Sequence, residues 1–227
     1  MLEGQSLAEI NPSPTPQSRP LSEDAYEQLE ELIVTMELAP GTLVTEQELA
    51  QRIGLGRTPV REAVLRLSKE YLILIMPRRG LRIAPIDIRQ QLRLVETRRA
   101  LEVLVASHAA ERANRQERAV FQSLAKSFRN DGRKSYRRFL KIDQKFNMAV
   151  AAACDNEFAV NALGSLHGLS RRFWHYYAGH EDDLGLVAEM HAEVAEAIAV
   201  GDVKRVTEGV TAHMNYIQAF TRAMLKD

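Results

Sequence analysis

The chain has 227 residues, 45% of them hydrophobic, with 30 basic and 30 acidic side chains and a single cysteine, Cys154. This length allows one large domain or two smaller ones, and the composition is that of an ordinary globular protein. A single cysteine excludes an internal disulfide and fits a reducing compartment. With no visible export signal, and no apolar run near the roughly 20 residues that cross a bilayer, we expect a cytoplasmic protein outside the membrane.

The first 20 residues contain four of the eight prolines, among Ser, Thr, Asn and Gln. This composition is typical of a flexible tail. Beyond it, apolar residues at helical spacing predict a helix that Ser22 caps and that ends near Glu37, before the breaking residues 39–41.

Residues 45–69 predict a pair of short helices. Thr45 and Glu48 have the spacing of a capping box, which starts a helix that stops near Gly54. The next helix is expected over residues 57–69, with a proline in its first turn, where proline is tolerated.

A basic hairpin follows these helices. Residues 72–75 and 81–83 predict two short strands, joined by a turn at residues 77–80. Two helices, the second of which begins with a basic turn, followed by such a hairpin form the layout of a winged helix-turn-helix that reads DNA.

Positive charge is concentrated in this segment. Between residues 51 and 85, eight basic side chains stand against two acidic ones, and eight minus two leaves a charge of +6. Such a local potential favours contact with a phosphate backbone, although the whole chain is neutral by formal count. A solvated basic helix beside an unrelated hairpin is the alternative, and the ordered set of elements favours DNA binding over it. The charged residues are Arg52, Arg57, Arg61, Arg66, Lys69, Arg78, Arg79 and Arg82, with Glu62 and Glu70.

The side chains expected to read DNA lie in two places. Arg57, Thr58 and Arg61 lie at the N-terminal end of the second helix of the pair, the end that a recognition helix inserts into the major groove. An arginine there can donate two hydrogen bonds to guanine, worth roughly 1–3 kcal/mol of discrimination. Arg78 and Arg79 at the hairpin tip are expected to reach the adjacent backbone or the minor groove.

A second domain is expected after Pro85, where the apolar pattern becomes helical throughout. The fold class is therefore mainly α. An N-terminal winged helix-turn-helix at residues 21–85 follows a tail at residues 1–20 and precedes a C-terminal antiparallel all-α helical bundle at residues 86–227. About six bundle helices are predicted, at residues 86–113, 115–130, 133–153, 157–177, 182–200 and 202–225.

Polar side chains interrupt the apolar stripes of four of these helices. His213 and His191 fill gaps in the last two helices, Asp143 and Asn147 lie one turn apart on the third, and Arg98 lies on the first. Buried polar groups need partners, so these side chains are expected to meet in the bundle interior. Two imidazoles and a carboxylate suit a divalent transition metal. Zn²⁺ is expected, Ni²⁺, Mn²⁺ or Fe²⁺ are also compatible, and Asn147 is the weaker ligand. Open coordination positions would admit the carboxylate of a small molecule, which Arg98 is expected to hold.

The N-terminal motifs resemble the winged-helix domain of the GntR family. The matching residues are Pro40-Gly41, Glu46, Leu49-Ala50, Ile53-Gly54, the RTPVREA run at residues 57–63, and Arg78-Arg79-Gly80. The resemblance covers about residues 22–85. It implies that the DNA contacts fall on Gln47, Arg57, Thr58, Arg61 and Gly80.

Two positions depart from the pattern of that family. Gly56 replaces the usual Ser or Thr before the arginine, which removes a helix cap and a phosphate contact. Residues 69–72 (KEYL) replace the common acidic-Gly-Leu turn, so the wing can enter at a different angle. Neither change removes a base-reading arginine.

Residues 86–225 resemble the FCD effector domain of the FadR-like branch of GntR regulators. The carried-over residues are Asp143 in Asp-x-x-x-Asn, His191 in Met-His-Ala-Glu-Val, His213 in Ala-His-Met, and Arg98 in Arg-Arg-Ala-Leu-Glu. In the family the position of Asn147 is often His, which bears on the identity and tightness of the metal. The resemblance implies a small organic or sugar acid as effector. It also implies a homodimer that binds a double-stranded DNA operator with paired half-sites.

Three functions are compatible with these sequence features. A ligand-responsive transcription regulator, with repression as the commoner expectation, explains both halves of the chain. A regulator whose interior site is structural or senses the metal itself needs no organic effector. A metal-dependent hydrolase would leave the DNA-reading half unexplained, and no general base stands beside the expected ligands, so we expect that the protein is not an enzyme.

Overall fold

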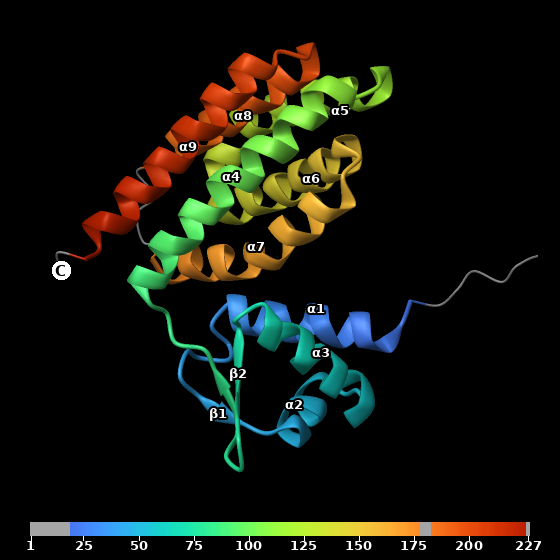
Figure 1. The fold of residues 1–227 in the computed structure, drawn as a ribbon, viewed down its shortest axis with the longest axis vertical. Coiled ribbons are helices and arrows are strands. Elements are labelled where there is room, and N and C mark those ends of the chain that lie inside the picture. Colours follow the sequence, from blue (N-terminus) through green and yellow to red (C-terminus); the bar gives the residue numbers. More distant parts are fainter. Residues whose placement is uncertain (1–18, 178–182, 226–227) are drawn as a thin grey trace, which may run out of the picture.

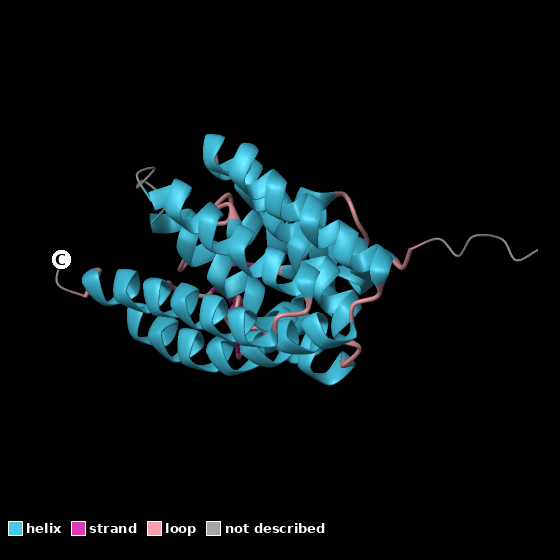
Figure 2. Cartoon of the chain, turned by 90° about the horizontal axis from the view of Figure 1, so that it is seen from above, coloured by secondary structure: helices cyan, strands magenta, loops and turns pink. Residues whose placement is uncertain are grey.

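The computed structural model describes residues 19–177 and 183–225 (Figure 1). Most of the predicted tail, residues 1–18, lies outside the described residues, as does residue 182, where one bundle helix is expected to begin. The described chain is mainly helical, with an N-terminal helix-turn-helix and wing beside a C-terminal helical bundle, and this confirms the predicted fold class (Figures 1 and 2).

The N-terminal part begins with a helix whose ends differ from the prediction. Helix α1 spans Leu21–Val34, and Pro20 rather than Ser22 occupies the N-cap position. The helix stops three residues before Glu37 because Met36 turns into the left-handed region, with a φ of 65°. The apolar face of α1 is buried as its spacing predicts, through Leu29 and Ile33 among others.

The next two helices match their predicted positions. Helix α2 spans Glu46–Ile53, with the capping box of Thr45 and Glu48 formed in both directions and Gly54 in the left-handed conformation at its end. Helix α3 spans Arg57–Lys69 and buries Val60, Ala63, Val64 and Leu67 against its neighbours.

A three-stranded antiparallel sheet forms the wing. Strand β2 spans Ile73–Met76 and strand β3 spans Gly80–Ile83, each within one residue of prediction at either end. Strand β1, Leu43–Val44, is absent from the sequence-based prediction because two residues carry no periodicity, and it exists only through its pairing with β3. The strand order β1-β3-β2 places β3 in the centre.

The C-terminal part is a helical bundle. Its helices are α4 (Ile88–Arg112), α5 (Arg115–Asn130), α6 (Tyr136–Cys154), α7 (Glu157–Tyr177), α8 (Leu184–Val200) and α9 (Val203–Ala223), with a short 3-10 turn at Gly132–Lys134. Helix α6 begins three residues later than predicted because that turn precedes it and Ser135 caps it. Helix α4 begins two residues later because Asp87 is its cap, where the Asp87 side chain accepts from the amides of Arg89 and Gln90.

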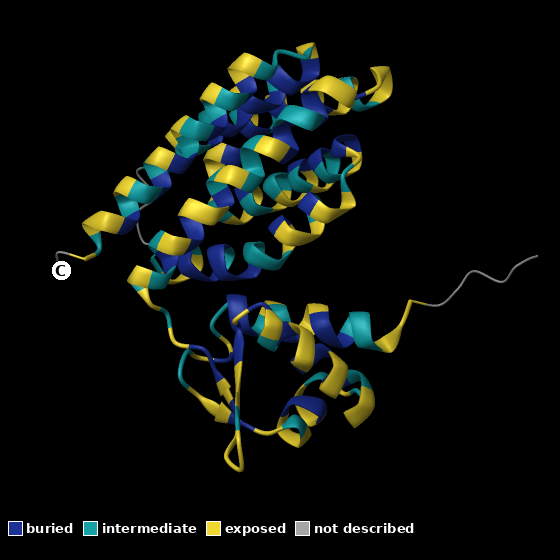
Figure 3. Cartoon of the chain, viewed as in Figure 1, coloured by how far each residue is buried: buried dark blue, intermediate teal, exposed yellow. Residues whose placement is uncertain are grey.

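Two apolar cores hold the described chain together. One lies inside the bundle around Phe121, Phe128 and Met214. The other lies inside the winged helix-turn-helix, and it also contains Leu94 of α4 and Leu169 of α7. Figure 3 shows buried residues in both parts of the described chain. The N-terminal core therefore extends onto the underside of the bundle, so that the two parts share buried apolar surface.

Candidate DNA-reading face and interior polar site

The N-terminal end of α3 presents a polar, exposed surface. Because the buried residues of α3 follow its helical period, Arg57, Thr58 and Arg61 face away from the core and are exposed. Gly56 precedes the helix and has no side chain with which to cap it, so the first amides stay available to an anion.

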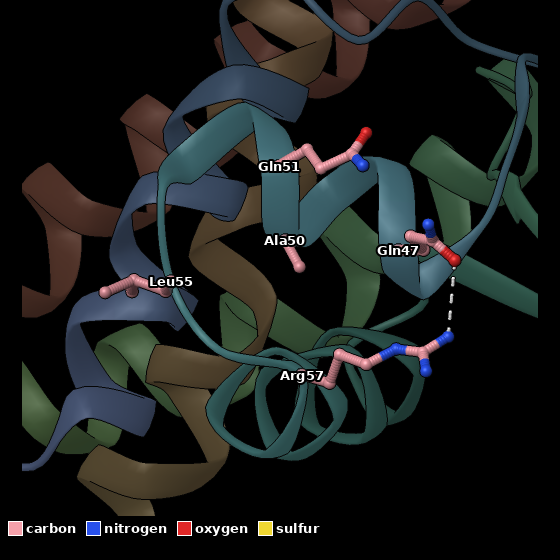
Figure 4. A pocket seen from close by; sticks show the side chains of 5 residues that line it. All are labelled: Gln47, Ala50, Gln51, Leu55 and Arg57. Atoms are coloured by element: carbon pink, nitrogen blue, oxygen red, sulfur yellow. Dashed lines mark hydrogen bonds between the residues drawn. The ribbon is translucent and has the colours of Figure 1, made fainter.

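Helix α2 contributes to the same surface. The Nη2 atom of Arg57 donates to the Oε1 atom of Gln47 at 3.4 Å, across a shallow pocket that Ala50, Gln51 and Leu55 also line (Figure 4). Gln47 therefore lies beside the arginine that is expected to read the bases. A bond this long holds the guanidinium only loosely.

The wing places its basic residues at an exposed tip. Arg78 and Arg79 are exposed at the turn between β2 and β3, which is closed by the amide of Arg79 donating to the carbonyl of Met76 at 3.0 Å. Gly80 has a φ of +85°, and a Cβ there would stand 3.1 Å from the carbonyl oxygen of Val44. A glycine is thus needed for the wing to pack against β1.

The bundle interior brings several of the predicted polar residues together. Asp143 Oδ1 lies 3.4 Å from His191 Nε2, and the Asn147 amide donates to Asp143 Oδ2 at 3.1 Å. The rings of His191 and His213 touch, with centroids 4.4 Å apart. His191 Nδ1 lies 2.7 Å from the carbonyl oxygen of Val187, to which it donates, and Nε2 faces Asp143.

The charges of this cluster are set by burial and by one another. Burial raises the pKa of Asp143, but the hydrogen bond and positive charge of His191, then the charges of His167 and Arg98, outweigh it and leave that pKa below its ordinary value. Burial, then the charges of His191 and Arg98, holds the pKa of His213 well below its ordinary value. At neutral pH the cluster thus offers the ionised carboxylate of Asp143 and the neutral imidazole of His213.

These donors suit a transition metal by chemistry, but they are not assembled into a cage. Within residues 19–177 and 183–225, no three His, Cys, Asp or Glu side chains stand close enough to hold an ion as they are placed. Asn147 turns its amide hydrogens toward Asp143 and so supports that carboxylate as a donor. Holding a metal on Asp143, His191 and His213 would require the side chains to move together.

Arg98 is buried, as its place on an apolar stripe predicts, and already has partners. Its Nε donates to Glu102 Oε1 at 2.8 Å, its Nη2 donates to the same carboxylate, and its Nη1 donates to the hydroxyl of Ser170. The residue is 8% exposed. A carboxylate from outside would therefore have to displace Glu102 or share the guanidinium with it.

Sequence reasoning missed four residues around this site. Glu102 follows Arg98 by one helical turn, a spacing visible in the sequence, whereas Ser170 and His167 come from α7 by a long-range contact that no local pattern shows. The hydroxyl of Tyr136 is buried without a hydrogen-bond partner among the described residues. Burial and the nearby charge of Asp143 raise the pKa of Tyr136 to about 12, although Arg171 opposes them, so the group stays a neutral donor.

Comparison with known proteins assigns both parts of the chain. Residues 21–83 match the model for bacterial regulatory proteins of the gntR family, and residues 93–216 match the model for the FCD domain. The chain belongs to the GntR family of regulators that carry an FCD domain. The recognition helix and the wing of this GntR protein are therefore parts of a DNA-binding transcriptional regulator.

Relatives and solved structures agree with this assignment. The HTH-type transcriptional repressor RspR of Escherichia coli K12 is 26% identical over 220 residues, which is 96% of this chain and 94% of that protein. The Nta operon transcriptional regulator of Aminobacter aminovorans is 28% identical over 135 residues, 60% of this chain and 64% of that protein. The structure of E. coli McbR/YncC has the same fold, with a TM-score of 0.78 over 92% of this chain and all of that one, at 20% identity.

No helix within the described residues combines the length and the apolar character that a membrane-spanning segment needs.

Proposed function

We propose that this GntR-family regulator is a homodimeric repressor in the cytoplasm, released from its operator when a small carboxylate binds inside the FCD bundle. The observation that carries the proposal is the buried guanidinium of Arg98 near Asp143, His191 and His213, a cluster of charged and polar groups inside the bundle. A buried charge is costly unless it is paired, and the pairing of Arg98 with Glu102 shows that this guanidinium can bind a carboxylate. The relative named a repressor supports the sign of regulation.

The chemistry of the site favours an organic acid. Arg98 can hold a carboxylate by two parallel hydrogen bonds once Glu102 gives way. The buried hydroxyl of Tyr136 and the ring of His167 offer further polar contacts, which suit a hydroxy acid or a sugar acid.

A divalent transition metal fits this proposal as a second element. Asp143, His191 and His213 are the residues that would hold it, with Asn147 as a supporting or weak fourth ligand, and Zn²⁺ is the expected ion. Such an ion would supply a Lewis acid to which the effector carboxylate binds. The protein acts by binding and not by catalysis in this proposal.

A melting-temperature screen against small organic and sugar acids tests the proposal, run with added Zn²⁺ and again after chelation. An effector present at about 100 times its Kd should stabilise the protein by roughly 2.7 kcal/mol. We expect a stabilising acid whose effect disappears in Arg98→Ala, and weakens on chelation or in His213→Ala.

Two other outcomes discriminate the alternatives. If chelation alone abolishes operator binding and no acid alters that binding, the protein senses the metal. Glu102 would then be the carboxylate that Arg98 holds, with no organic effector in its place. If neither acids nor chelation changes the melting temperature, the site is structural and the effector proposal is wrong.

A further inference from the structure

One helix of the bundle, α7, contacts both halves of the described chain. Residues 168–170 and 172–173 are buried, and Arg171 between them is half-buried, so most of the circumference of this stretch is covered. A helix covered on most of its sides packs against several neighbouring elements. Figure 1 shows α7 along the underside of the bundle, directly above α1, and the two helices are in contact.

The lower side of α7 holds the DNA-reading half through charge. Arg171 Nη2 donates to Glu30 Oε1 of α1 at 2.5 Å. Arg172, 2% exposed, donates from Nη1 to the carbonyl of Ala84 at 2.9 Å and from Nη2 to that of Pro85 at 3.1 Å. Both carbonyls belong to the segment that joins the wing to the bundle. A buried guanidinium is strongly destabilised if its acceptors move away.

Close packing makes this contact sensitive to small shifts. A Cβ at Gly168 would stand 2.8 Å from Glu30 Oε1 and 2.9 Å from Leu72 Cδ1, so α7 approaches both α1 and the start of the wing as closely as a glycine permits. Leu169 also belongs to the apolar core of the N-terminal half. Close-packed interfaces of this kind switch between discrete packing arrangements and do not deform gradually.

The opposite side of the same helical turn faces the interior polar site. The hydroxyl of Ser170 accepts from Arg98 Nη1, and both residues are buried. Ser170 and Arg171 are consecutive residues of a rigid helix. Arg171 binds Glu30 of α1, and Ser170 binds Arg98. A movement at Arg98 cannot shift Ser170 without shifting Arg171.

We propose that α7 transmits the state of the Arg98 site to the DNA-reading half, through Ser170 on one side and the Glu30 and linker contacts of Arg171 and Arg172 on the other. This inference rests on the proposed effector function. A carboxylate that takes Arg98 from Glu102 and Ser170 releases α7, and α1 and the linker change position with it. The reciprocal also holds, since DNA that favours one position of α1 changes the affinity at Arg98.

The test uses the full chain without DNA or effector. Ser170→Ala removes the contact with Arg98, and Ser165→Ala on the same helix is the matched control, since Ser165 bonds the Ala162 carbonyl of its own helix. Amide hydrogen exchange is followed in residues 21–34 and in residues 84, 86 and 87. We expect exchange there to rise about fivefold or more in Ser170→Ala, a typical coupling, and to stay unchanged in Ser165→Ala.

A double-mutant cycle decides whether the effect travels through α7. In a Glu30→Gln background, whose contact with Arg171 is already weakened, Ser170→Ala should change exchange of residues 21–34 by less than about twofold. If the two changes multiply independently, the coupling is refuted. Two controls separate this local coupling from global destabilisation. Urea unfolding measures the overall stability of each variant, and a decrease in that stability would raise exchange in α5 and α9 as well.

A second variant approaches the same joint without touching the interior. Gly168→Ala should displace Glu30 and raise exchange in residues 21–34, while leaving the Arg98 contacts in place. If it leaves that exchange unchanged, α7 does not position α1. None of these measurements needs an effector, so the two proposals can fail separately. Coupling through α7 with no hit in the ligand screen would refute the effector proposal alone. A ligand hit without coupling through α7 would refute the coupling alone.

Discussion

The residues of the proposed DNA-binding surface are exposed, whereas those of the interior polar site are buried or half-buried and already have partners. The side chains proposed to read DNA, those of Arg57, Thr58 and Arg61, are exposed, as suits groups that must adapt to base edges. Arg98 and His191 are buried and each already has a partner. The proposed effector would therefore exchange one set of contacts for another, so its net binding free energy would depend on how well it replaces Glu102.

Tyr71 is a local point of backbone strain. It has a φ of 61° and is 58% exposed, at the turn where GntR domains commonly have glycine. The left-handed conformation costs a residue with a Cβ about 1 kcal/mol. Tyr71→Gly should therefore raise the free energy of unfolding by about that amount in a urea titration. Tyr71→Ala keeps the Cβ and should give no gain, and an equal gain in both variants would show that the backbone is not strained.

His213 predicts an acid-sensitive bundle. Because its folded pKa lies well below that of the unfolded chain, the unfolded state binds the additional proton as the pH falls below about 6.5, and stability decreases as a result. In chelated protein the decrease from this one group should be about 1.4 kcal/mol at pH 5.5. His213→Gln should flatten the dependence by roughly 1.2 kcal/mol between pH 7 and 5.5, since a small part of the loss is already present at pH 7. Parallel curves for both proteins would mean that His213 is not buried as a neutral imidazole.

At the scale of elements, we expect α3 and the wing to make different contributions to DNA binding. Helix α3 is fixed by a buried face and exposes its first turn, where we expect the base contacts. The β2–β3 hairpin is anchored by β1 and exposes Arg78 and Arg79 at its tip. We expect the helix to supply sequence discrimination and the wing to supply affinity that depends on salt.

The wing prediction concerns the salt dependence of affinity. Replacing Arg78 and Arg79 by alanine should weaken binding to all duplexes alike, and should lower the slope of log Kd against log salt by about 0.9 for each phosphate that the wing no longer neutralises. Fluorescence anisotropy on a selected and a scrambled duplex measures both quantities. Weaker binding to the selected duplex alone would instead assign these arginines to base reading.

At the scale of the whole molecule, the two sites lie in separate parts that share buried surface. The N-terminal core includes Leu94 and Leu169 of the bundle, and Arg171 and Arg172 of α7 bond to α1 and the linker. The DNA-reading half is thus held against the effector half by specific buried contacts, and not by the linker alone. In the proposed dimer, this arrangement would let an effector change the spacing of the two DNA-binding parts.

What the sequence predicts here depends on how local each signal is. Helices α2 and α3 match their predicted bounds because a capping box, a left-handed glycine and an apolar face all lie within a few residues. Strand β1 and the early end of α1 depend on tertiary pairing and on the turn at Met36, which leave no periodic trace. The interior stripes predicted that Asp143, His191 and His213 converge, but not that α7 supplies Ser170 and His167.

The central claim is that the first turn of α3 reads DNA. The most direct test measures Kd for a duplex selected by this protein from a random pool, using Arg57→Ala with Arg61→Ala. The control replaces Arg133 and Arg137, two exposed arginines of the bundle, and so removes the same charge. We predict that the α3 pair raises Kd at least about tenfold and abolishes the preference over a scrambled duplex, since each bidentate base contact is worth roughly 1–3 kcal/mol. An unchanged preference in the α3 pair, or an equally large effect in the control, would contradict the assignment of the recognition helix.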